Sequence, residues 1–510
     1  MAEQSMKDES SLARARMMLE RARWAAAAFA RLDRETTLRI AEAAAEAGFA
    51  KSQAYAEWAV KETGFGVAEH KKIKNELCSR GLYEHYRNEL FVGTKIDAEH
   101  KIVEVARPAG VVFALTPSTN PVSTVYFKII CALMTRNAVI VSPHPLAKAC
   151  CADAARTMAE AATRAGAPDG AVQVIEEPTI PLINAIMGDP RTDVILATGG
   201  TAMVRAAYSS GNPAIGVGPS NVPVLVDATA DLGKAAKRIV ASKSFDNSVL
   251  CTNESVLIAE AAIADKLVRH MQGEGAYLCS EEELAKLRAY LFPGGRFNVK
   301  AVGRDASWIA NEAGIRAPGK SKILLAPFDL AVPEEPFARE KLCPVLGFMR
   351  VPNAQRGIEA ARALLRHNGA GHSAAIHSRD PRTILAFTAA VRVLRVVVNA
   401  PCSQGAAGFD TNLAPSMTIG TGFFGRSSIG ENVGPQHLVN WTRIAYNKDP
   451  SEAFGDFEHL EPWDVQAPDG TEGLDLPRPR MSRGDDTLGE MREEIRKVII
   501  EELRSLFMGN

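Results

Sequence analysis

Residues 110–115 read Gly110-Val111-Val112-Phe113-Ala114-Leu115, a short apolar run of the kind that forms a buried strand. Similar runs follow at 137–141, 193–197 and 222–226, and Ala-rich segments with helical spacing lie between them. Strands that alternate with helices of this length form a parallel, doubly wound sheet. We therefore predict an α/β domain of the Rossmann type that extends from Lys101 to about Ala228.

The segments on both sides of this domain predict further structure. Residues from about Ser11 to Leu90 are rich in Ala, Arg, Glu and Leu with helical spacing of the apolar positions, which predicts a helical lead-in. Further α/β segments, including apolar runs at 255–258 and 396–399, extend from about Leu232 to Gly434. We expect a first domain over residues 1–230, which holds the lead-in and the first sheet, and a second α/β domain over residues 231–434.

The C-terminal part of the chain differs in composition from both domains. After a short segment over residues 435–448, residues 449–486 hold many Pro, Gly, Asp and Glu with little periodicity, which predicts a flexible linker. In residues 487–510 the apolar side chains recur every three or four positions, and charged side chains occupy mostly the other faces. This pattern predicts a short amphipathic helix.

Composition excludes several classes of protein. The 59 basic and 60 acidic side chains give a formal net charge of -1, which provides no field to attract nucleic acid or anionic lipid. The apolar stretches end well before the roughly 18–20 residues that a membrane helix needs. Eight cysteines without CxxC spacing fit neither a disulfide framework nor a metal site. Because the N-terminus lacks the apolar core of an export signal, we expect a soluble cytoplasmic protein.

The first candidate for chemistry is a cysteine in the segment from Ser248 to Glu254. This segment places Cys251 between a polar turn and the expected strand at 255–258. Loops at strand ends of α/β domains commonly carry functional side chains. The alternative is a structural cysteine, because free cysteines are among the most often buried residues.

Two further segments follow expected strands. In residues 116–121, Asn120 presents an amide that could donate hydrogen bonds to a developing oxyanion, although it could equally be an ordinary turn residue beside a proline. Residues 198–201, Thr-Gly-Gly-Thr, lie between a strand and a helical run, where free backbone N–H groups suit a pyrophosphate. This segment is not GxGxxG, and a plain strand-to-helix turn fits it as well.

Taken in order, these segments resemble the aldehyde dehydrogenase superfamily. The resemblance is closer to its CoA-acylating branch of acetaldehyde and propionaldehyde dehydrogenases, and it covers residues 101–448. The specific segments are 116–121, 142–145 (Ser-Pro-His-Pro), 198–201, 250–252, 340–345, 371–373, 418–425 and 431–432.

The resemblance implies a role for individual residues. Cys251 would be the covalent nucleophile, and Asn120 with the backbone N–H of Cys251 would form the oxyanion hole. Glu340 would hold the nicotinamide ribose, unless it is a surface charge beside Arg339 and Lys341. The residues implied in binding NAD(P)+ and coenzyme A are Thr116, Pro117, Ser142, His144, Thr198, Gly199, Gly200, Thr201, Val217 and Glu340. His144 and His372 could each touch coenzyme or substrate, or could be structural.

The sequence departs from the family pattern at two positions. Hydrolytic relatives carry a glutamate that activates water, and Gly216 stands at the matching position here. Without a positioned base, water attack on the acyl-enzyme loses a factor of roughly 10²–10⁴, whereas a thiol ionises far more readily. The expected reaction is therefore aldehyde + CoA + NAD(P)+ to acyl-CoA + NAD(P)H. Ser142 replaces a lysine found near the adenosine ribose in many hydrolytic relatives, which leaves the choice between NAD and NADP open.

The resemblance also implies partners. Strands near residues 101–106 (within a predicted element at 98–108) and 438–446 would build a dimer or tetramer. The 487–510 segment resembles the encapsulation peptides that bind shell proteins of bacterial microcompartments, although a packing or oligomer helix is the alternative and a membrane-surface helix a weaker one.

Three other functions compete with this interpretation. One is a hydrolytic or phosphate-dependent dehydrogenase of the same superfamily, against which Gly216 argues. Another is a catalytically silent assembly protein, against which the joint presence of Cys251 and Asn120 argues. A nucleic-acid-binding module is the third, and the balanced charge argues against it.

Overall fold

The computed structural model describes residues 2–460 and residue 462. The predicted amphipathic helix at 487–510 and most of the predicted linker at 449–486 lie outside these residues. Within them, no helix is both long enough and apolar enough to cross a membrane.

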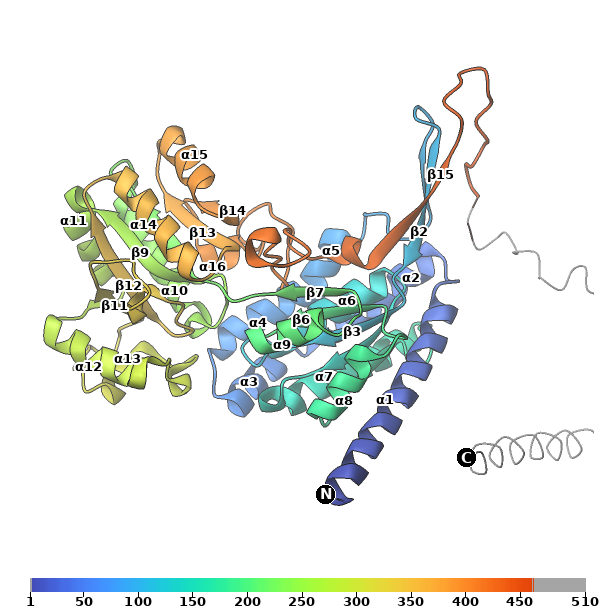
Figure 1. Cartoon of the computed structure of the whole chain (residues 1–510), viewed down its shortest axis with the longest axis horizontal. Helices are drawn as coiled ribbons and strands as arrows, with labels where there is room; N and C mark the ends of the chain where they lie inside the picture. Colours follow the sequence, from blue (N-terminus) through green and yellow to red (C-terminus); the bar gives the residue numbers. More distant parts are fainter. Residues whose placement is uncertain (1, 461, 463–510) are drawn as a thin grey trace, which may run out of the picture. The chain divides into compact units, whose positions relative to one another are not determined.

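The first sheet has five parallel strands in the order β5-β4-β3-β6-β7 (Figure 1). The first strand of this sheet, β3, lies at the centre, the next two extend to one edge, and the chain then returns to the other side. This order places a topological switch point between β3 and β6, where ligands of such sheets bind. The predicted doubly wound sheet is confirmed. The strands are β3 (Val111–Leu115), β4 (Ala138–Ser142), β5 (Val172–Val174), β6 (Val194–Thr198) and β7 (Ala214–Val217).

Helices connect and cover these strands. Helix α6 begins with a proline in its first turn, and all of its residues are buried, so that it forms part of the core beside the sheet. The other helices of this sheet are α7 (Lys148–Arg164), α8 (Ile180–Gly188) and α9 (Thr201–Tyr208), and α6 spans Pro121–Met134.

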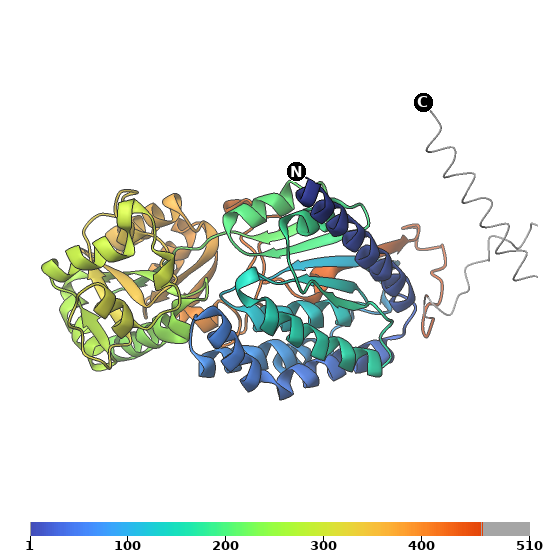
Figure 2. The ribbon, with the colours of Figure 1, turned by 90° about the horizontal axis from the view of Figure 1, so that it is seen from below.

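The predicted helical lead-in is also confirmed. Figure 2 shows its first helix, in dark blue, lying against the first sheet, where it contacts α8 and β4. A single π-helical turn, η1, interrupts the last two helices of the lead-in. The elements are α1 (Ala2–Phe29), α2 (Arg34–Ala50), α3 (Ser52–Thr63), α4 (Ala68–Glu76), η1 (Leu77–Gly81) and α5 (Leu82–Tyr86).

The second sheet has seven parallel strands in the order β10-β11-β12-β9-β8-β13-β14. The expectation that the run at 222–226 closes the first sheet, inside a domain ending at residue 230, is wrong. This run is β8, which pairs with β9 and β13 of the second sheet. A short apolar run carries no information about which sheet it joins, because the same pattern suits both. The strands are β8 (Val222–Val226), β9 (Glu254–Glu260), β10 (Ala276–Leu278), β11 (Ile323–Pro327), β12 (Val345–Val351), β13 (Gly371–His377) and β14 (Val393–Val398).

Helices and short turns surround the second sheet. The α-helices are α10 (Leu232–Ser244), α11 (Ala261–Gly273), α12 (Glu281–Leu291), α13 (Ala306–Glu312), α14 (Ala354–His367), α15 (Pro381–Ala390) and α16 (Cys402–Gly405). The single 3₁₀ turns are η2 (Pro145–Ala147), η3 (Phe245–Ser248), η4 (Pro293–Gly295), η5 (Val299–Ala301), η6 (Pro336–Ala338), η7 (Phe423–Gly425) and η8 (Pro435–Leu438).

A third, antiparallel sheet contains β1 (Thr94–Asp97), β2 (Ile102–Pro108) and β15 (Val439–Ala445). Strands β2 and β15 pair along their whole length, from Val439 opposite Pro108 to Ala445 opposite Ile102. They run side by side in Figure 1. The two strands expected near 101–106 and 438–446 therefore exist and pair with each other, whereas their role in an oligomer stays a prediction.

Candidate active site

The connection between the two parallel sheets explains where a site can form. Strand β7 ends at Val217 and β8 begins at Val222, so a short link carries the chain from the carboxyl edge of the first sheet to the amino edge of the second. Strand β9 lies next to β8 and begins at Glu254. Residues that follow β3, β6 and β7 therefore meet the loop that leads into β9.

A cavity of about 530 Å³ lies at this junction. Except for His372, its lining includes every residue that the sequence singled out for catalysis or cofactor binding, namely Thr116, Pro117, Asn120, Ser142, His144, Thr198, Gly199, Gly200, Thr201, Val217, Cys251 and Glu340. The lining also includes apolar residues that the sequence did not single out, among them Val249, Leu250, Leu342, Met417 and Ile419. Mostly apolar walls with a few polar groups are typical of small-molecule sites.

Cys251 differs from the other cysteines of the chain. Seven of the eight are buried, whereas Cys251 is partly exposed at the cavity. Burial of the sulfur, and then the nearby charge of Glu340, raise the pKa of Cys251 to about 12, although Arg395 and Lys74 lower it. The resting thiol is therefore protonated at neutral pH, and the structural alternative of a buried cysteine does not hold.

The loop that presents Cys251 begins with a strained turn. Asp246, Asn247 and Ser248 have φ values of 50°, 51° and 64°. Each left-handed residue other than glycine costs about 1–2 kcal/mol, so contacts must hold this turn in place. The Asn247 amide donates to the carbonyl of Gly303 at 3.0 Å and to the carboxylate of Asp305 at 2.9 Å. These long-range bonds fix the turn that directs the chain toward the cavity.

Asn120 lies at the start of α6 and faces the same loop. Its side-chain Nδ2 donates to the Val249 carbonyl at 3.2 Å and approaches the Thr119 hydroxyl at 3.3 Å. Its Oδ1 accepts a 2.5 Å hydrogen bond from Nζ of Lys74. The structure thus brings the two expected catalytic residues, Asn120 and Cys251, to one wall of the cavity.

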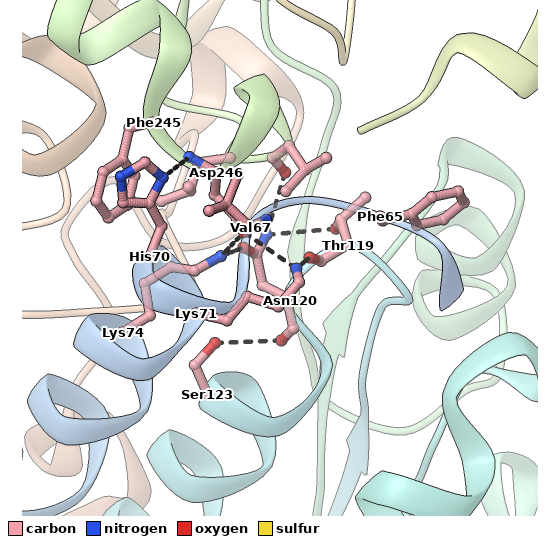
Figure 3. Close-up of polar contacts among 12 residues, drawn as sticks. Phe65, Val67, His70, Lys71, Lys74, Thr119, Asn120, Ser123, Phe245 and Asp246 are labelled. Carbon is pink, nitrogen blue, oxygen red and sulfur yellow. Dashed lines mark hydrogen bonds and ion pairs between the residues drawn. The ribbon is translucent and has the colours of Figure 1, made fainter. Parts of the chain in front are cut away.

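A buried charge cluster behind Asn120 was not predicted from the sequence. Lys71 and Lys74, both on α4, form ion pairs with the carboxylate of Asp246, and the Lys71 pair measures 3.0 Å. Figure 3 shows this cluster between α4 and the turn before Cys251. The three-residue spacing of the lysines places them on one helix face, but the sequence offers no signal that Asp246 lies opposite.

The residues at the carboxyl edge of the first sheet offer polar groups to a ligand. Among the described residues, the buried hydroxyls of Thr116 and Ser142 have no hydrogen-bond partner. Nδ1 of His144 accepts from the backbone N–H of Leu146, so Nε2 is the nitrogen free to contact a ligand. Burial lowers the pKa of His144, which keeps the ring neutral at pH 7.

Glu340 is connected to the nucleophile through a serine. The Ser220 hydroxyl is 2.7 Å from the Glu340 carboxylate and 2.5 Å from the carbonyl oxygen of Cys251. Burial raises the pKa of Glu340 to about 7. Because Glu340 lines the cavity and is bonded to Ser220, the alternative of a solvated surface charge does not hold.

Gly216 lies in the buried strand β7, and the space beside it is filled. A Cβ atom there would lie 2.7 Å from Val204 Cγ1 and 2.8 Å from Tyr208 Cε2. The backbone N–H of Gly216 also donates to the Tyr208 hydroxyl at 2.9 Å. A larger side chain at this position would have to push aside the side chains of Val204 and Tyr208.

Comparison with known proteins agrees with this geometry. A sequence profile of the aldehyde dehydrogenase family matches residues 6–283, which is more than half of the chain. The chain belongs to the aldehyde dehydrogenase family. This family member is also 40% identical over 397 residues to an aldehyde-alcohol dehydrogenase from Clostridium acetobutylicum, a match that covers 77% of this chain and 46% of that protein. The chain therefore spans about half the length of the aldehyde-alcohol dehydrogenases that it matches.

Solved structures of other aldehyde dehydrogenases share the fold. An acetylating aldehyde dehydrogenase from Geobacillus thermoglucosidasius has 40% identity and a TM-score of 0.85, over 86% of this chain and 98% of that one. A propionaldehyde dehydrogenase from Rhodopseudomonas palustris, solved with bound propionyl-CoA, has 29% identity and a TM-score of 0.77, over 85% and 94% of the two chains. The predicted fold and the resemblance to the acylating branch are confirmed.

His372 does not belong to the cavity of this aldehyde dehydrogenase. It is fully buried in β13, its Nδ1 lies 3.1 Å from the Ser373 hydroxyl, and burial lowers its pKa to about 3. The buried guanidinium of Arg395 donates to the carbonyls of His372 and Gly371, and to that of Gly420 in the glycine-rich segment. These contacts favour the structural role among the two that the sequence left open for His372.

Proposed function

We propose that this chain is a CoA-acylating aldehyde dehydrogenase that oxidises a short-chain aldehyde through a thioester on Cys251. One observation carries the proposal: a partly exposed cysteine and an amide donor share a cavity, while the position of the hydrolytic base is a glycine, Gly216, beside which Val204 and Tyr208 occupy the space of a side chain. The similar structure that was solved with propionyl-CoA supports coenzyme A as the acyl acceptor.

The carboxyl edge of the first sheet fits a dinucleotide. The switch point between β3 and β6 opens on the cavity, and Thr116 and Ser142 present buried hydroxyls that have no partner among the described residues. These hydroxyls and His144 suit ribose, the glycines at 199 and 200 allow phosphate to approach the backbone, and Glu340 suits the nicotinamide ribose. When bound, NAD(P)+ supplies the acceptor for the hydride that leaves the aldehyde carbon.

The side chains of the cavity then account for the chemistry on the aldehyde. The Cys251 thiol loses its proton to solvent, the thiolate adds to the carbonyl carbon, a C–S bond forms, and the carbonyl oxygen becomes an alkoxide. The Asn120 amide and the backbone N–H of Cys251 donate hydrogen bonds to this oxygen. Loss of hydride from the carbon leaves an acyl group bound to Cys251 as a thioester.

The second half of the reaction releases the acyl group. The coenzyme A thiolate adds to the acyl carbon, the C–S bond to Cys251 breaks, and acyl-CoA leaves while the Cys251 thiolate is restored. Water competes poorly, because the chain places no carboxylate at Gly216 to remove its proton. This difference favours the acylating reaction over the hydrolytic alternative.

A panel of aldehydes tests the proposal. Purified protein is assayed for NADH or NADPH with acetaldehyde, propionaldehyde and lactaldehyde, each with and without coenzyme A. We expect sustained turnover only with coenzyme A, and the panel identifies the preferred aldehyde and nucleotide. Sustained turnover to free acid without coenzyme A would favour the hydrolytic alternative, and no turnover with any aldehyde would favour a silent assembly protein.

The nucleophile is tested by a matched pair of variants. Cys251→Ala removes the attacking sulfur, so we expect CoA-dependent turnover to fall by at least roughly 10³-fold without a change in thermal stability. Cys279→Ala, at a buried cysteine that does not line the cavity, should retain activity. Activity near that of the natural protein in Cys251→Ala would contradict the assignment.

Location and assembly are separate proposals that rest on the sequence. We propose a cytoplasmic homo-oligomer, a dimer or tetramer, that enters a bacterial microcompartment through residues 487–510. Fusion of these residues to a fluorescent protein should give puncta in a compartment-forming cell, whereas a diffuse signal would contradict targeting. Light scattering of the purified chain measures the oligomer.

A further inference from the structure

We propose that Lys74 is a positioning residue for the aldehyde reaction: it fixes the orientation of the Asn120 amide and holds a positive charge behind it. The proposal rests on the proposed function, because it assigns Lys74 a part in stabilising the alkoxide formed on Cys251. It starts from the three polar contacts of the Asn120 side chain, and Figure 3 shows Asn120 with Lys74 and Asp246.

The chemistry of the two partners settles which way the amide points. A lysine ammonium can only donate hydrogen bonds, so the atom of Asn120 that lies 2.5 Å from Lys74 Nζ has to be Oδ1. Nδ2 then faces the opposite side, where it meets the carbonyl of Val249, two residues before Cys251. Rotation of the amide by half a turn would place Oδ1 against the Val249 carbonyl and Nδ2 against the Lys74 ammonium, so both partners hold the amide in this orientation.

The remaining N–H of Asn120 is available to a ligand. One N–H of Nδ2 is directed at the Val249 carbonyl, and the other makes only a 3.3 Å contact with the hydroxyl of its neighbour Thr119. The Thr119 hydroxyl can turn to another partner at little cost, so this N–H can instead donate a hydrogen bond to an alkoxide oxygen in the cavity. A charge-assisted bond at Oδ1 also polarises the amide and strengthens its N–H as a donor.

The charge balance of the cluster of Lys71, Lys74 and Asp246 also supports a positive charge behind Asn120. Lys71 and Lys74 are 3% and 1% exposed, and both contact the single carboxylate of Asp246, which is fully buried. Two titratable neighbours of the cluster, His70 on α4 and Cys78 on η1, are neutral at pH 7, because burial lowers the pKa of His70 and raises that of Cys78. With both lysines protonated, the cluster therefore carries one positive charge more than Asp246 neutralises.

An uncompensated buried charge costs stability. Lys74 lowers the pKa of Cys251, so its charge reaches the site where the thiolate and then the alkoxide form. Negative charge that develops beside Asn120 during the reaction would balance the excess. This is the electrostatic arrangement that stabilises an oxyanion without reorganisation.

The other lysine of the cluster supplies a matched control. Lys71 pairs with the same carboxylate, but its second bond goes to the backbone carbonyl of Thr119 at 3.0 Å and not to the Asn120 side chain. Either Lys71→Met or Lys74→Met removes one buried ammonium and leaves a neutral pair with Asp246. Only Lys74→Met removes the donor to Asn120, so the two variants separate positioning from general stability.

The test measures the first turnover of the full chain. Protein is mixed rapidly with aldehyde and NAD+ without coenzyme A, and the rate of the initial burst of NADH is recorded. The steady-state KM for the aldehyde is measured separately with coenzyme A present. We expect Lys74→Met to slow the burst by roughly 10–100-fold, at or below the loss that follows removal of one oxyanion donor, with KM changed less than about threefold. Lys71→Met should slow the burst less than about threefold. We expect it to lower the melting temperature by about as much as Lys74→Met does.

A double variant decides whether Lys74 acts through Asn120. We expect Asn120→Ala to slow the burst by roughly 10²–10³-fold, and Lys74→Met added to it to cost less than about threefold more. If the double variant loses burst rate by the product of the two single losses, the proposal is overturned. A Lys74→Met burst as fast as that of Lys71→Met would also overturn it. If Lys74→Met does not fold, the pair Lys74→Gln and Lys71→Gln replaces it, and equal burst rates in that pair would overturn the proposal.

The outcome for the natural protein keeps the two proposals apart. If the unaltered chain forms no NADH with any aldehyde, the proposed function fails before Lys74 is tested. If the unaltered chain is active and acylates coenzyme A, but Lys74→Met matches it, the proposed function stands and only the role of Lys74 fails.

Discussion

The two edges that meet at the cavity are built in opposite ways. At the carboxyl edge of the first sheet, Ser142 and Thr198 end β4 and β6, and Thr116 comes directly after β3. Each residue is therefore positioned by its immediate neighbours in sequence. At the amino edge of the second sheet, Cys251 is presented by a left-handed turn. That turn is held by residues some 60 to 180 positions away, including Gly303 and Lys71.

We call the carboxyl edge of the first sheet the binding edge and the amino edge of the second sheet, which carries Cys251, the reacting edge. The comparison teaches that the two edges respond differently to substitutions. A residue on a strand end keeps its place as long as the sheet forms, and its loss removes one contact to a ligand. The nucleophile keeps its place only while distant elements hold a strained backbone. Substitutions far from the cavity should therefore affect the reaction more than substitutions of the polar groups that touch the cofactor.

Among the substitutions that compare the two edges, the largest effect is expected at a glycine that touches no ligand. Gly66 has φ +82°, and a Cβ there would lie 2.1 Å from Oδ1 of Asp246. We expect Gly66→Ala to displace Asp246 and to slow the NADH burst by roughly tenfold or more, in line with the loss of transition-state stabilisation from a misplaced group. Burst kinetics and thermal melting measure the two effects.

Gly166→Ala is the matched control for backbone strain. Gly166 has φ +109°, and nothing lies within 4 Å of its Cβ position. Both substitutions force alanine into a backbone region that it avoids and should destabilise the fold by about 1 kcal/mol or more. Only Gly66→Ala should slow the burst, and equal burst rates in the two variants would show that the turn tolerates displacement of Asp246.

A smaller effect is expected from Glu340→Gln on the reactivity of Cys251. Glu340 has a pKa raised to about 7, and its charge in turn raises the pKa of Cys251. Below pH 6 the carboxyl is protonated, so both proteins should be alkylated at similar rates. Above pH 8 the carboxylate opposes the thiolate only in the unaltered protein, so Glu340→Gln should react roughly three- to tenfold faster. Iodoacetamide labelling of the Cys251 peptide, followed by mass spectrometry, gives the rates. A difference in alkylation rate between the two proteins that becomes smaller as pH rises would contradict the predicted effect of Glu340.

The smallest effect is expected at the binding edge. Ser142 presents one hydroxyl to the cavity, and a neutral hydrogen bond contributes about 0.5–1.5 kcal/mol. Ser142→Ala should therefore raise the KM for the dinucleotide by roughly three- to tenfold and leave the burst rate at saturating nucleotide unchanged. A slower burst at saturation would mean that the two edges are not separable.

The same contrast explains what could be predicted from the sequence. The strands, the glycines at 199 and 200 and the residues after β3 are local patterns, and the resemblance to a family supplied their roles. The assignment of β8 to the second sheet depends on pairing with β9 and β13, which a five-residue apolar run does not encode. The cluster of Lys71, Lys74 and Asp246 joins positions more than 170 residues apart, so only the folded chain reveals it.

Peptide mass spectrometry tests the central claim most directly. The chain is incubated with propionaldehyde and NAD+ without coenzyme A, digested, and then compared with a sample to which coenzyme A was added before quenching. We expect one acyl group per chain, on the peptide that contains Cys251, and its quantitative transfer to acyl-CoA in the second sample. An adduct on another cysteine, or an acyl group that water removes as fast as coenzyme A does, would contradict the account.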